Sequence, residues 1–196
     1  MNNLILLMLI ASAIATLSCS PARESVGPVI HKSKSNTSSN PMLAFEARQI
    51  QNERPEITYG TLANDEAVIQ EAWPVISDRL QRKGFSQEEA QEATMVSWRE
   101  LRVKRLPAQQ PLTAAALESY AGALGKLVIN STPSDADVEI EGDVFDRKTN
   151  TAAWLGPGHY RIKVSKSGYA PAENSYTVRE GTKTEAYFTL RQERQQ

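Results

Sequence analysis

The alternation of apolar and polar residues between positions 125 and 190 is the feature that most restricts the fold of this chain. Runs such as Leu127–Ser131 and Tyr160–Val164 place every second side chain on one face, as half-buried strands require. Turn sequences such as Gly156–Gly158 break these runs at spacings of roughly 8–15 residues, which is the rhythm of an antiparallel sandwich. We therefore expect six or seven short strands over residues 125–191 and a short tail over residues 192–196.

Several short motifs in this stretch resemble the PEGA domain. They are the strand that begins at Gly125, the turn Leu155–Tyr160 with its Pro-Gly-His-Tyr sequence, and the pair Gly168-Tyr169. The Pro-Glu-Gly-Ala turn of that family reads Pro133–Ala136 here, with Asp135 in place of glycine. Asp tolerates a left-handed backbone less well than glycine but better than most residues. The resemblance implies a small β-sandwich of bacterial envelope and surface proteins that binds proteins or glycans and carries no catalytic residues.

The periodicity is helical rather than alternating in residues 63–124, which predict two or three helices. An apolar stripe at helical spacing precedes Gly84, which is placed to end the first helix. Pro74 lies within this stripe, so we expect a kink or a break just before it. Ser86 and Glu89 have the spacing of a capping box and predict the start of the next helix.

A third helix is expected from about Thr113 to Leu124, directly before the strands. Arg102, Lys104 and Arg105 fall near the end of the second helix, where the helix dipole favours cations, so we interpret them as C-terminal capping residues. The predicted fold class is α+β by segment. It comprises a disordered linker, a two- to three-helix segment and a small antiparallel PEGA-like β-sandwich.

Residues 1–19 are predicted to be a secretory signal peptide. Leu4–Leu17 is apolar or small throughout, and at about 14 residues it is shorter than the roughly 20 that a bilayer span requires. The sequence Thr16–Cys19 resembles a bacterial lipoprotein box, so we interpret Cys19 as the lipidation site. The alternative is ordinary signal cleavage after Ala15, which would release a soluble chain with an unpaired cysteine.

Residues 20–62 are rich in Ser, Asn, Pro and charged residues, and we interpret them as a disordered linker. As flexible coil, about 40 residues have a root-mean-square reach of roughly 35 Å, enough to hold a folded domain clear of a membrane surface. Apolar residues between Met42 and Asn52 have nearly helical spacing, so a short amphipathic helix there is the alternative.

The composition argues against most site chemistry. The chain has 196 residues, two histidines, one cysteine and a formal net charge of −1. This near-neutral charge gives no electrostatic reason to expect nucleic acid as a partner. Neither a glycine-rich phosphate loop nor a histidine or cysteine pair at metal-ligand spacing occurs in the sequence. We therefore expect no enzyme activity, no catalytic residues, no metal and no cofactor.

An acidic series is the one cluster with a candidate role. Asp137, Glu139 and Glu141 alternate with apolar residues and are expected on one solvated strand face, with Asp143 just beyond. Residues two apart on a strand are separated by about 6–7 Å, which is too far for one calcium ion to be held by this row. We interpret the four residues as a polar face or an acidic partner-binding edge.

A second resemblance concerns residues 83–101, which are faintly similar to the core-binding helices of extracytoplasmic-function sigma factors. In this chain the core of that motif is replaced by Glu92–Met95, and the segment is slightly acidic. A transcriptional role behind an export signal would be contradictory, so this nucleic-acid alternative is a minor one.

Together these features predict a membrane-tethered protein of the bacterial cell envelope whose PEGA-like domain binds an envelope protein or a peptidoglycan-type glycan. Ser20, which follows the expected lipidated cysteine, resembles an outer-membrane sorting signal, and a soluble periplasmic or secreted chain is the alternative. The alternative function is an accessory or regulatory subunit of an envelope enzyme or transporter.

Overall fold

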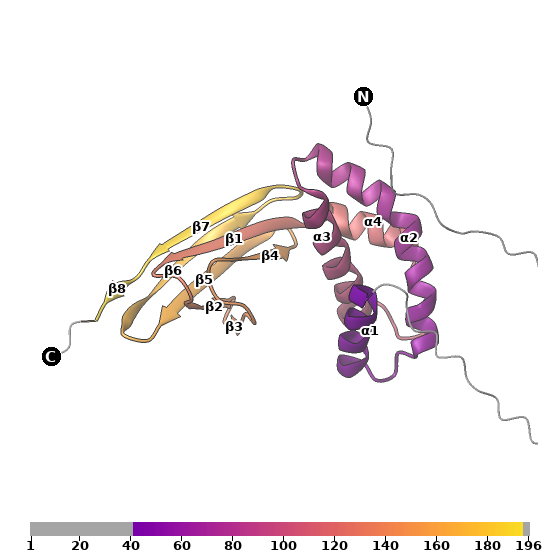
Figure 1. The fold of residues 1–196 in the computed structure, drawn as a ribbon, viewed down its shortest axis with the longest axis horizontal. Helices are drawn as coiled ribbons and strands as arrows, with labels where there is room; N and C mark the ends of the chain where they lie inside the picture. The colour runs from indigo at the N-terminus through magenta and orange to yellow at the C-terminus, as the bar shows by residue number, and fades with distance from the viewer. Residues whose placement is uncertain (1–40, 194–196) are drawn as a thin grey trace, which may run out of the picture. The chain divides into compact units, whose positions relative to one another are not determined.

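The computed structural model describes residues 41–193. In this part of the chain four helices and one π-helical turn precede two β-sheets, so the expected α+β class is confirmed (Figure 1). The helical elements are α1 (Pro41–Glu53), α2 (Tyr59–Arg82), α3 (Gln87–Glu100), the π-helical turn η1 (Leu101–Arg105) and α4 (Ala114–Ala123). The strands are β1 (Gly125–Thr132), β2 (Asp137–Ile140), β3 (Asp143–Val144), β4 (Thr151–Leu155), β5 (Gly158–Lys166), β6 (Tyr169–Val178), β7 (Lys183–Thr189) and β8 (Arg191–Gln192).

The helix boundaries follow from side-chain caps that the sequence predicts. The Ser86 hydroxyl accepts a hydrogen bond from the Glu89 N–H, and the Glu89 carboxylate accepts one from the Ser86 N–H, which completes the capping box. Thr113 caps α4 in the same position. Gly84 has a φ of 89° just after α2, which is the conformation that a helix-ending glycine supplies.

Of the kink or break expected at Pro74, the break does not occur, because α2 runs through this residue as one helix. Pro74 lies on the exposed side of α2, and so does Gln70, whose carbonyl loses its usual hydrogen bond. Water can solvate that carbonyl, while the buried stripe that includes Ile69 and Ile76 packs on both sides of the proline. The free energy gained by burying this stripe therefore outweighs the cost of the hydrogen bond lost at Pro74.

Residues 41–62 of the predicted linker belong to the folded part of the chain. Helix α1 lies within the predicted linker and buries Leu43 and Ile50, and Ile57 and Leu62 are buried in the same core. The alternative of a short helix near Met42 to Asn52 is therefore the correct one. These apolar side chains offset the cost of ordering the segment because they pack against α2 and α3.

A buried ion pair lies inside the helical core. Asp65 of α2 and Arg102 of η1 are each 1% exposed. The Arg102 guanidinium donates to both carboxylate oxygens of Asp65, with an Nε to Oδ2 distance of 2.6 Å. The Trp98 Nε1–H donates to the same carboxylate at 2.8 Å, so the buried charges have hydrogen-bond partners. The interpretation of Arg102 as a C-terminal capping residue is therefore wrong.

The strands form two sheets with the orders β4-β1-β7 and β3-β2-β5-β6-β8. Apolar residues from both sheets share one core, among them Leu127 of β1, Val164 of β5 and Phe188 of β7. The pairing of β1 with β7 is parallel, whereas every other pairing in the described part of the chain is antiparallel. The expectation of a purely antiparallel sandwich is corrected at this pair. Strands β2 to β6 lie between β1 and β7 in the sequence, and this long connection permits the parallel arrangement.

The junction between α4 and β1 requires a residue without a side chain at Gly125. A Cβ atom at this position would clash with the backbone carbonyl of Arg179 and with the side chain of Val178. The main chain of β1 therefore approaches the β6–β7 connection more closely than any other residue would allow.

Candidate functional site

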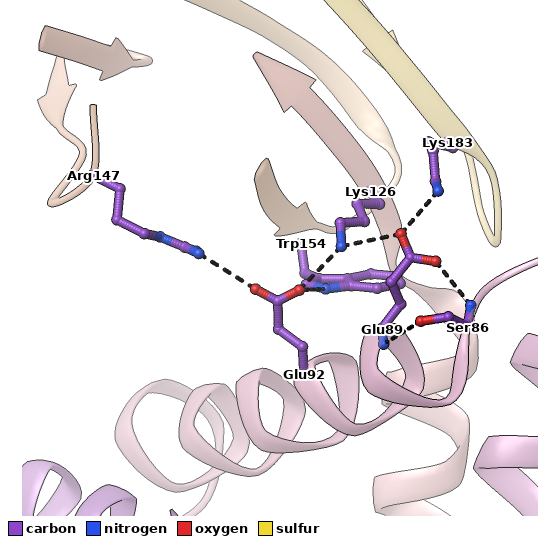
Figure 2. Close-up of polar contacts among 7 residues, drawn as sticks. All are labelled: Ser86, Glu89, Glu92, Lys126, Arg147, Trp154 and Lys183. Atoms are coloured by element: carbon purple, nitrogen blue, oxygen red, sulfur yellow. Dashed lines mark hydrogen bonds and ion pairs between the residues drawn. The ribbon is translucent and has the colours of Figure 1, made fainter. Parts of the chain in front are cut away.

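Helix α3 is joined to the sheets by a charged interface, drawn in Figure 2. Glu89 lies at its centre, and its carboxylate oxygen Oε1 lies 3.2 Å from the Lys126 ammonium of β1 and 2.8 Å from the Lys183 ammonium of β7. The second carboxylate oxygen accepts the Ser86 N–H of the capping box at 2.9 Å. The cap therefore fixes the carboxylate that binds both lysines.

Glu92, one helical turn further along α3, makes the second half of this interface. Its Oε2 atom accepts hydrogen bonds from the Lys126 ammonium at 3.1 Å and from the Trp154 indole N–H at 3.0 Å. Its Oε1 atom lies 3.4 Å from the Arg147 guanidinium (Figure 2). The i, i+3 spacing places Glu89 and Glu92 on the same side of the helix, and both therefore face the sheets.

The lysines set the protonation of these carboxylates. Burial raises the pKa of Glu89, but Lys183, the Ser86 N–H and Lys126 together lower that pKa to about 2. Burial also raises the pKa of Glu92, while hydrogen bonds from Trp154 and Lys126 outweigh that effect and lower it. Both carboxylates are thus ionised at neutral pH.

Apolar packing supports the same interface. The rings of Phe85 and Trp154 lie with centroids 5.0 Å apart, and Trp154 of β4 is buried with the helical core rather than with the core between the sheets. The Lys126 ammonium lies 5.3 Å from the centre of the Trp154 ring. A side chain of the sheet therefore belongs to the core of the helices.

Beside this interface lies a groove between the helices and the strand edges, with a volume of about 830 Å³. It is lined by α1, α3 and η1 on one side and by β3, β4 and the loop between them on the other. Two of its apolar side chains are largely exposed, Phe45 of α1 at 59% and Val144 of β3 at 79%. Exposed apolar side chains in a concave site are typical of a binding surface.

Ion pairs surround this groove. Arg99 of α3 contacts the carboxylates of Glu46 and Glu53 of α1, and Lys104 contacts Glu100 at 2.7 Å. Burial raises the pKa of Glu46 despite the nearby Arg99 guanidinium. The wall made by α1 is thus tied to α3 by charge pairs as well as by the apolar core.

Arg102 of the buried Asp65–Arg102 pair is next to the groove lining in the sequence. Val103 and Lys104, the residues after Arg102, line the groove. The Leu106 N–H donates to the Leu101 carbonyl at 2.7 Å, the bond that defines the π-helical turn. This turn directs Arg102 into the core and Val103 and Lys104 toward the groove.

The four acidic residues predicted as an interaction surface do not form one row. Asp137 lies 3.3 Å from the Lys148 ammonium, and Glu139 lies 3.0 Å from the Lys163 ammonium. Glu141 lies outside β2, in a turn with a φ of 55°, and its carboxylate accepts the Arg161 N–H. Asp143 lies on β3 and lines the groove. The structure thus places Asp143 at the groove, whereas Asp137 contacts Lys148 of the loop between β3 and β4, and Glu139 and Glu141 contact groups of β5.

Other predicted features lie outside the described residues. They are the signal peptide, Cys19, the alternative cleavage site at Ala15 and the first part of the linker, residues 20–40. In residues 41–193 no helix combines the length and apolar character needed to cross a membrane. The same residues hold no group of three or more histidine, cysteine, aspartate or glutamate side chains placed to bind a metal ion.

Sequence reasoning missed the groove and most of its residues. Phe45 falls within the predicted linker, and Val144 lies in a two-residue strand that is too short to give a periodic signal. The groove joins segments that are about 100 positions apart in the sequence, and no local pattern reports such a contact. The apolar residues of the α1 segment are the one feature of the sequence that could have indicated a binding surface there.

Comparison with known proteins identifies the C-terminal region. A search of curated proteins finds no match for this chain. The family model of the PEGA domain matches residues 124–194, a range that includes all eight strands from β1 to β8. The resemblance drawn from the sequence is therefore confirmed, and the β region of this chain is a PEGA domain.

Proposed function

We propose that this protein is a membrane-tethered component of the bacterial cell envelope, and that its groove binds a segment of another envelope protein. The exposure of Phe45 and Val144 within the groove is the observation that carries the proposal. Complete burial of such a side chain contributes roughly 1.5–3 kcal/mol. The two side chains alone could therefore supply much of the free energy of a modest protein complex.

The groove favours a protein partner over a glycan. A sugar presents hydroxyl groups that need several free polar partners, whereas the charged groups at this groove largely pair with one another, as Arg99 does with Glu46 and Glu53. The two largely exposed side chains are apolar and suit the side chains of another protein. A peptidoglycan-type glycan is the alternative ligand.

The envelope location rests on the domain and on the predicted signal. PEGA domains typically occur in envelope-associated proteins, and residues 124–194 match that family. We propose that Cys19 carries the lipid anchor, because it ends an apolar run of the signal type. Two or more acyl chains would hold the protein at a membrane durably.

Capture from solubilised membranes tests the binding role. The full chain is used as bait in mild detergent, together with Phe45→Ser and Val144→Ser. Tyr187→Ser is the matched control, because Tyr187 is 67% exposed and lies outside the groove lining. We expect one stoichiometric protein with the wild type and the control, and about tenfold less with either groove variant. Equal capture by all four baits would contradict the proposal.

Retention on a purified cell-wall fraction tests the glycan alternative with the same four proteins. If the wall fraction retains the wild type and releases the groove variants, the ligand is a glycan. The identity of a captured protein tests the second candidate function. An envelope enzyme or transporter whose activity changes when this chain is added would indicate an accessory or regulatory subunit.

Metabolic labelling with a fatty acid tests the anchor. The wild-type chain should incorporate the label and sediment with membranes, and Cys19→Ser should abolish both. A wild-type chain that remains unlabelled, with a mature amino terminus after Ala15, would contradict lipidation.

A further inference from the structure

The groove runs along an open edge of a sheet. Strand β4 is the outermost strand of the sheet β4-β1-β7, and within residues 41–193 no strand pairs with its second edge. Ala153 and Trp154 point to opposite faces of this sheet because successive side chains alternate, yet both line the groove. A groove that is lined by residues from both faces of one strand must run along the edge of that strand. The backbone groups on this edge of β4 are therefore directed toward the groove.

Both walls of the groove supply apolar contacts for an added strand. Phe45 of α1 faces the groove from the helices, and Val144 comes from β3, the outermost strand of the other sheet. A segment on the edge of β4 would place alternate side chains toward these two residues. Its length is limited to about five paired residues, since β4 contains five.

The charge of the lining indicates the chemistry of the segment. Seven carboxylate side chains and three cationic ones line the groove. The acidic residues are Glu46, Glu53, Glu88, Glu92, Glu100, Asp143 and Asp146, and the basic residues are Arg99, Lys104 and Arg147. The three cations already contact groove carboxylates. Because Glu92 also pairs with Lys126 and Asp146 lies near Arg147, Glu88 and Asp143 are the two lining carboxylates without an ion pair among residues 41–193, and they favour a segment that carries Lys or Arg.

We propose that the groove binds a basic, extended segment of a partner protein, which adds to the edge of β4 as a further strand. This inference rests on the proposed function and specifies the partner segment. Main-chain hydrogen bonds to β4 hold the backbone, apolar side chains contact Phe45 and Val144, and Lys or Arg side chains meet the acidic rim at Glu88 and Asp143.

Three synthetic peptides separate these contributions. The first is a capped peptide of about nine residues in which Val and Lys alternate, which matches both the strand period and the charge. The second has Glu in place of Lys. The third keeps the Val and Lys side chains but carries N-methyl groups on alternate amides, so one edge of the peptide cannot donate hydrogen bonds to a strand.

Binding to the full chain is measured by fluorescence anisotropy in mild detergent. We expect the first peptide to bind with a Kd below 1 mM, and the other two to bind at least about tenfold more weakly. Hydrogen exchange of the β4 amides should slow when the first peptide is added. Phe45→Ser and Val144→Ser should weaken its binding by about tenfold, and Tyr187→Ser should not.

Each other outcome contradicts a specific part of the proposal. Equal binding of the N-methylated peptide would exclude an added strand, and equal binding of the Glu peptide would exclude a basic segment. Lack of binding by all three peptides at 1 mM would exclude both. A chain in which residues 22–34 are replaced by a Gly-Ser sequence is also compared. If it binds the first peptide tenfold more tightly, the groove is occupied by this chain's own segment and not by a partner.

The capture experiment distinguishes this proposal from the broader one. If a membrane protein is lost from the Phe45→Ser and Val144→Ser baits while the N-methylated peptide binds normally, the groove binds a partner without strand addition. If capture is unchanged in both variants but the first peptide binds as expected, strand addition stands and the proposed role of the groove in the envelope is wrong.

Discussion

The helical region and the PEGA domain have cores of a similar apolar character but contain different polar groups. The helices enclose a complete ion pair, Asp65 with Arg102, and the indole of Trp98 completes its hydrogen bonds. In the PEGA domain the buried hydroxyls of Ser131 and Thr149 lie 2.6 Å apart, and its one buried charged side chain among residues 124–193, Lys126, pairs with carboxylates of α3 rather than within the domain. The interior of the helical region therefore depends on a pair of charged side chains, whereas the interior of the PEGA domain depends on strand register and turn conformation.

The largest effect is expected when the buried pair is broken. Arg102→Leu leaves the Asp65 carboxylate buried without its cation, and we expect the free energy of unfolding to fall by about 3–5 kcal/mol. Urea unfolding followed by circular dichroism measures the change. Arg82→Ala is the matched control, because its partner Asp78 and Arg82 itself are exposed, and the expected change is below about 0.5 kcal/mol.

The double variant Asp65→Leu with Arg102→Met sharpens this point. It replaces both charges by apolar groups, and we expect it to recover most of the stability lost in the single variant. A single variant that loses less than about 1 kcal/mol would show that water or rearrangement solvates Asp65, and the contrast between the two cores would then disappear.

Trp154 connects the two regions, so its removal should uncouple them. Trp154→Ala deletes a side chain of the sheet that is buried in the helical core, and we expect a loss of about 3 kcal/mol. In the wild type the helical circular dichroism signal and the exchange of sheet amides should report one transition, and in the variant they should report two. Trp73→Ala on α2 is the control, since this tryptophan is only partly buried and packs within the helical region.

If Trp154→Ala still unfolds in a single transition, the charged interface alone couples α3 to the sheets. That interface would then be the site to disrupt, through Lys126, whose side chain contacts both Glu89 and Glu92.

The pH dependence of stability should report Glu89. Because its pKa is about 2 in the folded chain and about 4.3 in an unfolded chain, its contribution is present above pH 4.3 and is lost as the pH falls toward 2. We expect Glu89→Gln to be less stable than the wild type by about 1 kcal/mol at pH 7 and equal to it near pH 2.

Thermal melts across this pH range measure the effect. Lys183→Met removes the cation at 2.8 Å and should shift the loss of stability to higher pH. A difference between wild type and Glu89→Gln that stays constant from pH 7 to pH 2 would show that the carboxylate contributes through hydrogen bonding alone.

Local patterns in the sequence predicted much of the architecture. The capping box of Ser86 and Glu89, the terminator Gly84 and the alternation in the β region act over a few residues, so each can be read directly. The pairing of Asp65 with Arg102 spans 37 positions. A basic residue in the last turn of a helix looks the same whether it faces water or a buried carboxylate, and only the tertiary fold decides between them.

The same limit applies to the candidate site. Trp154 fits the alternation of a strand, but its contact with Phe85 across the two regions has no local signal. The groove depends on which strands lie at the sheet edges. That order follows from the crossing of the chain between two sheets, and the spacing of the strands does not reveal it.

The smallest predicted effect concerns the turn that departs from the PEGA family at Asp135. The backbone at this position is left-handed, since Asp135 has a φ of 58°. Asp135→Gly should relieve this strain and raise the free energy of unfolding by up to about 1 kcal/mol, less the greater freedom of glycine in the unfolded chain. Asp135→Val should lower it, because a β-branched residue resists this conformation most. Thermal melts of both variants measure the changes.

Glu141 provides a matched control for this prediction, because its φ of 55° is nearly the same. Its carboxylate accepts the Arg161 N–H, so Glu141→Gly gains backbone freedom but loses a hydrogen bond, and we expect a smaller gain or none. If Asp135→Gly instead lowers the melting temperature, its side chain stabilises the turn by more than the strain costs. The stability of the PEGA domain would then depend on a polar side chain at this turn, and the contrast with the helical core would be weaker than the buried groups indicate.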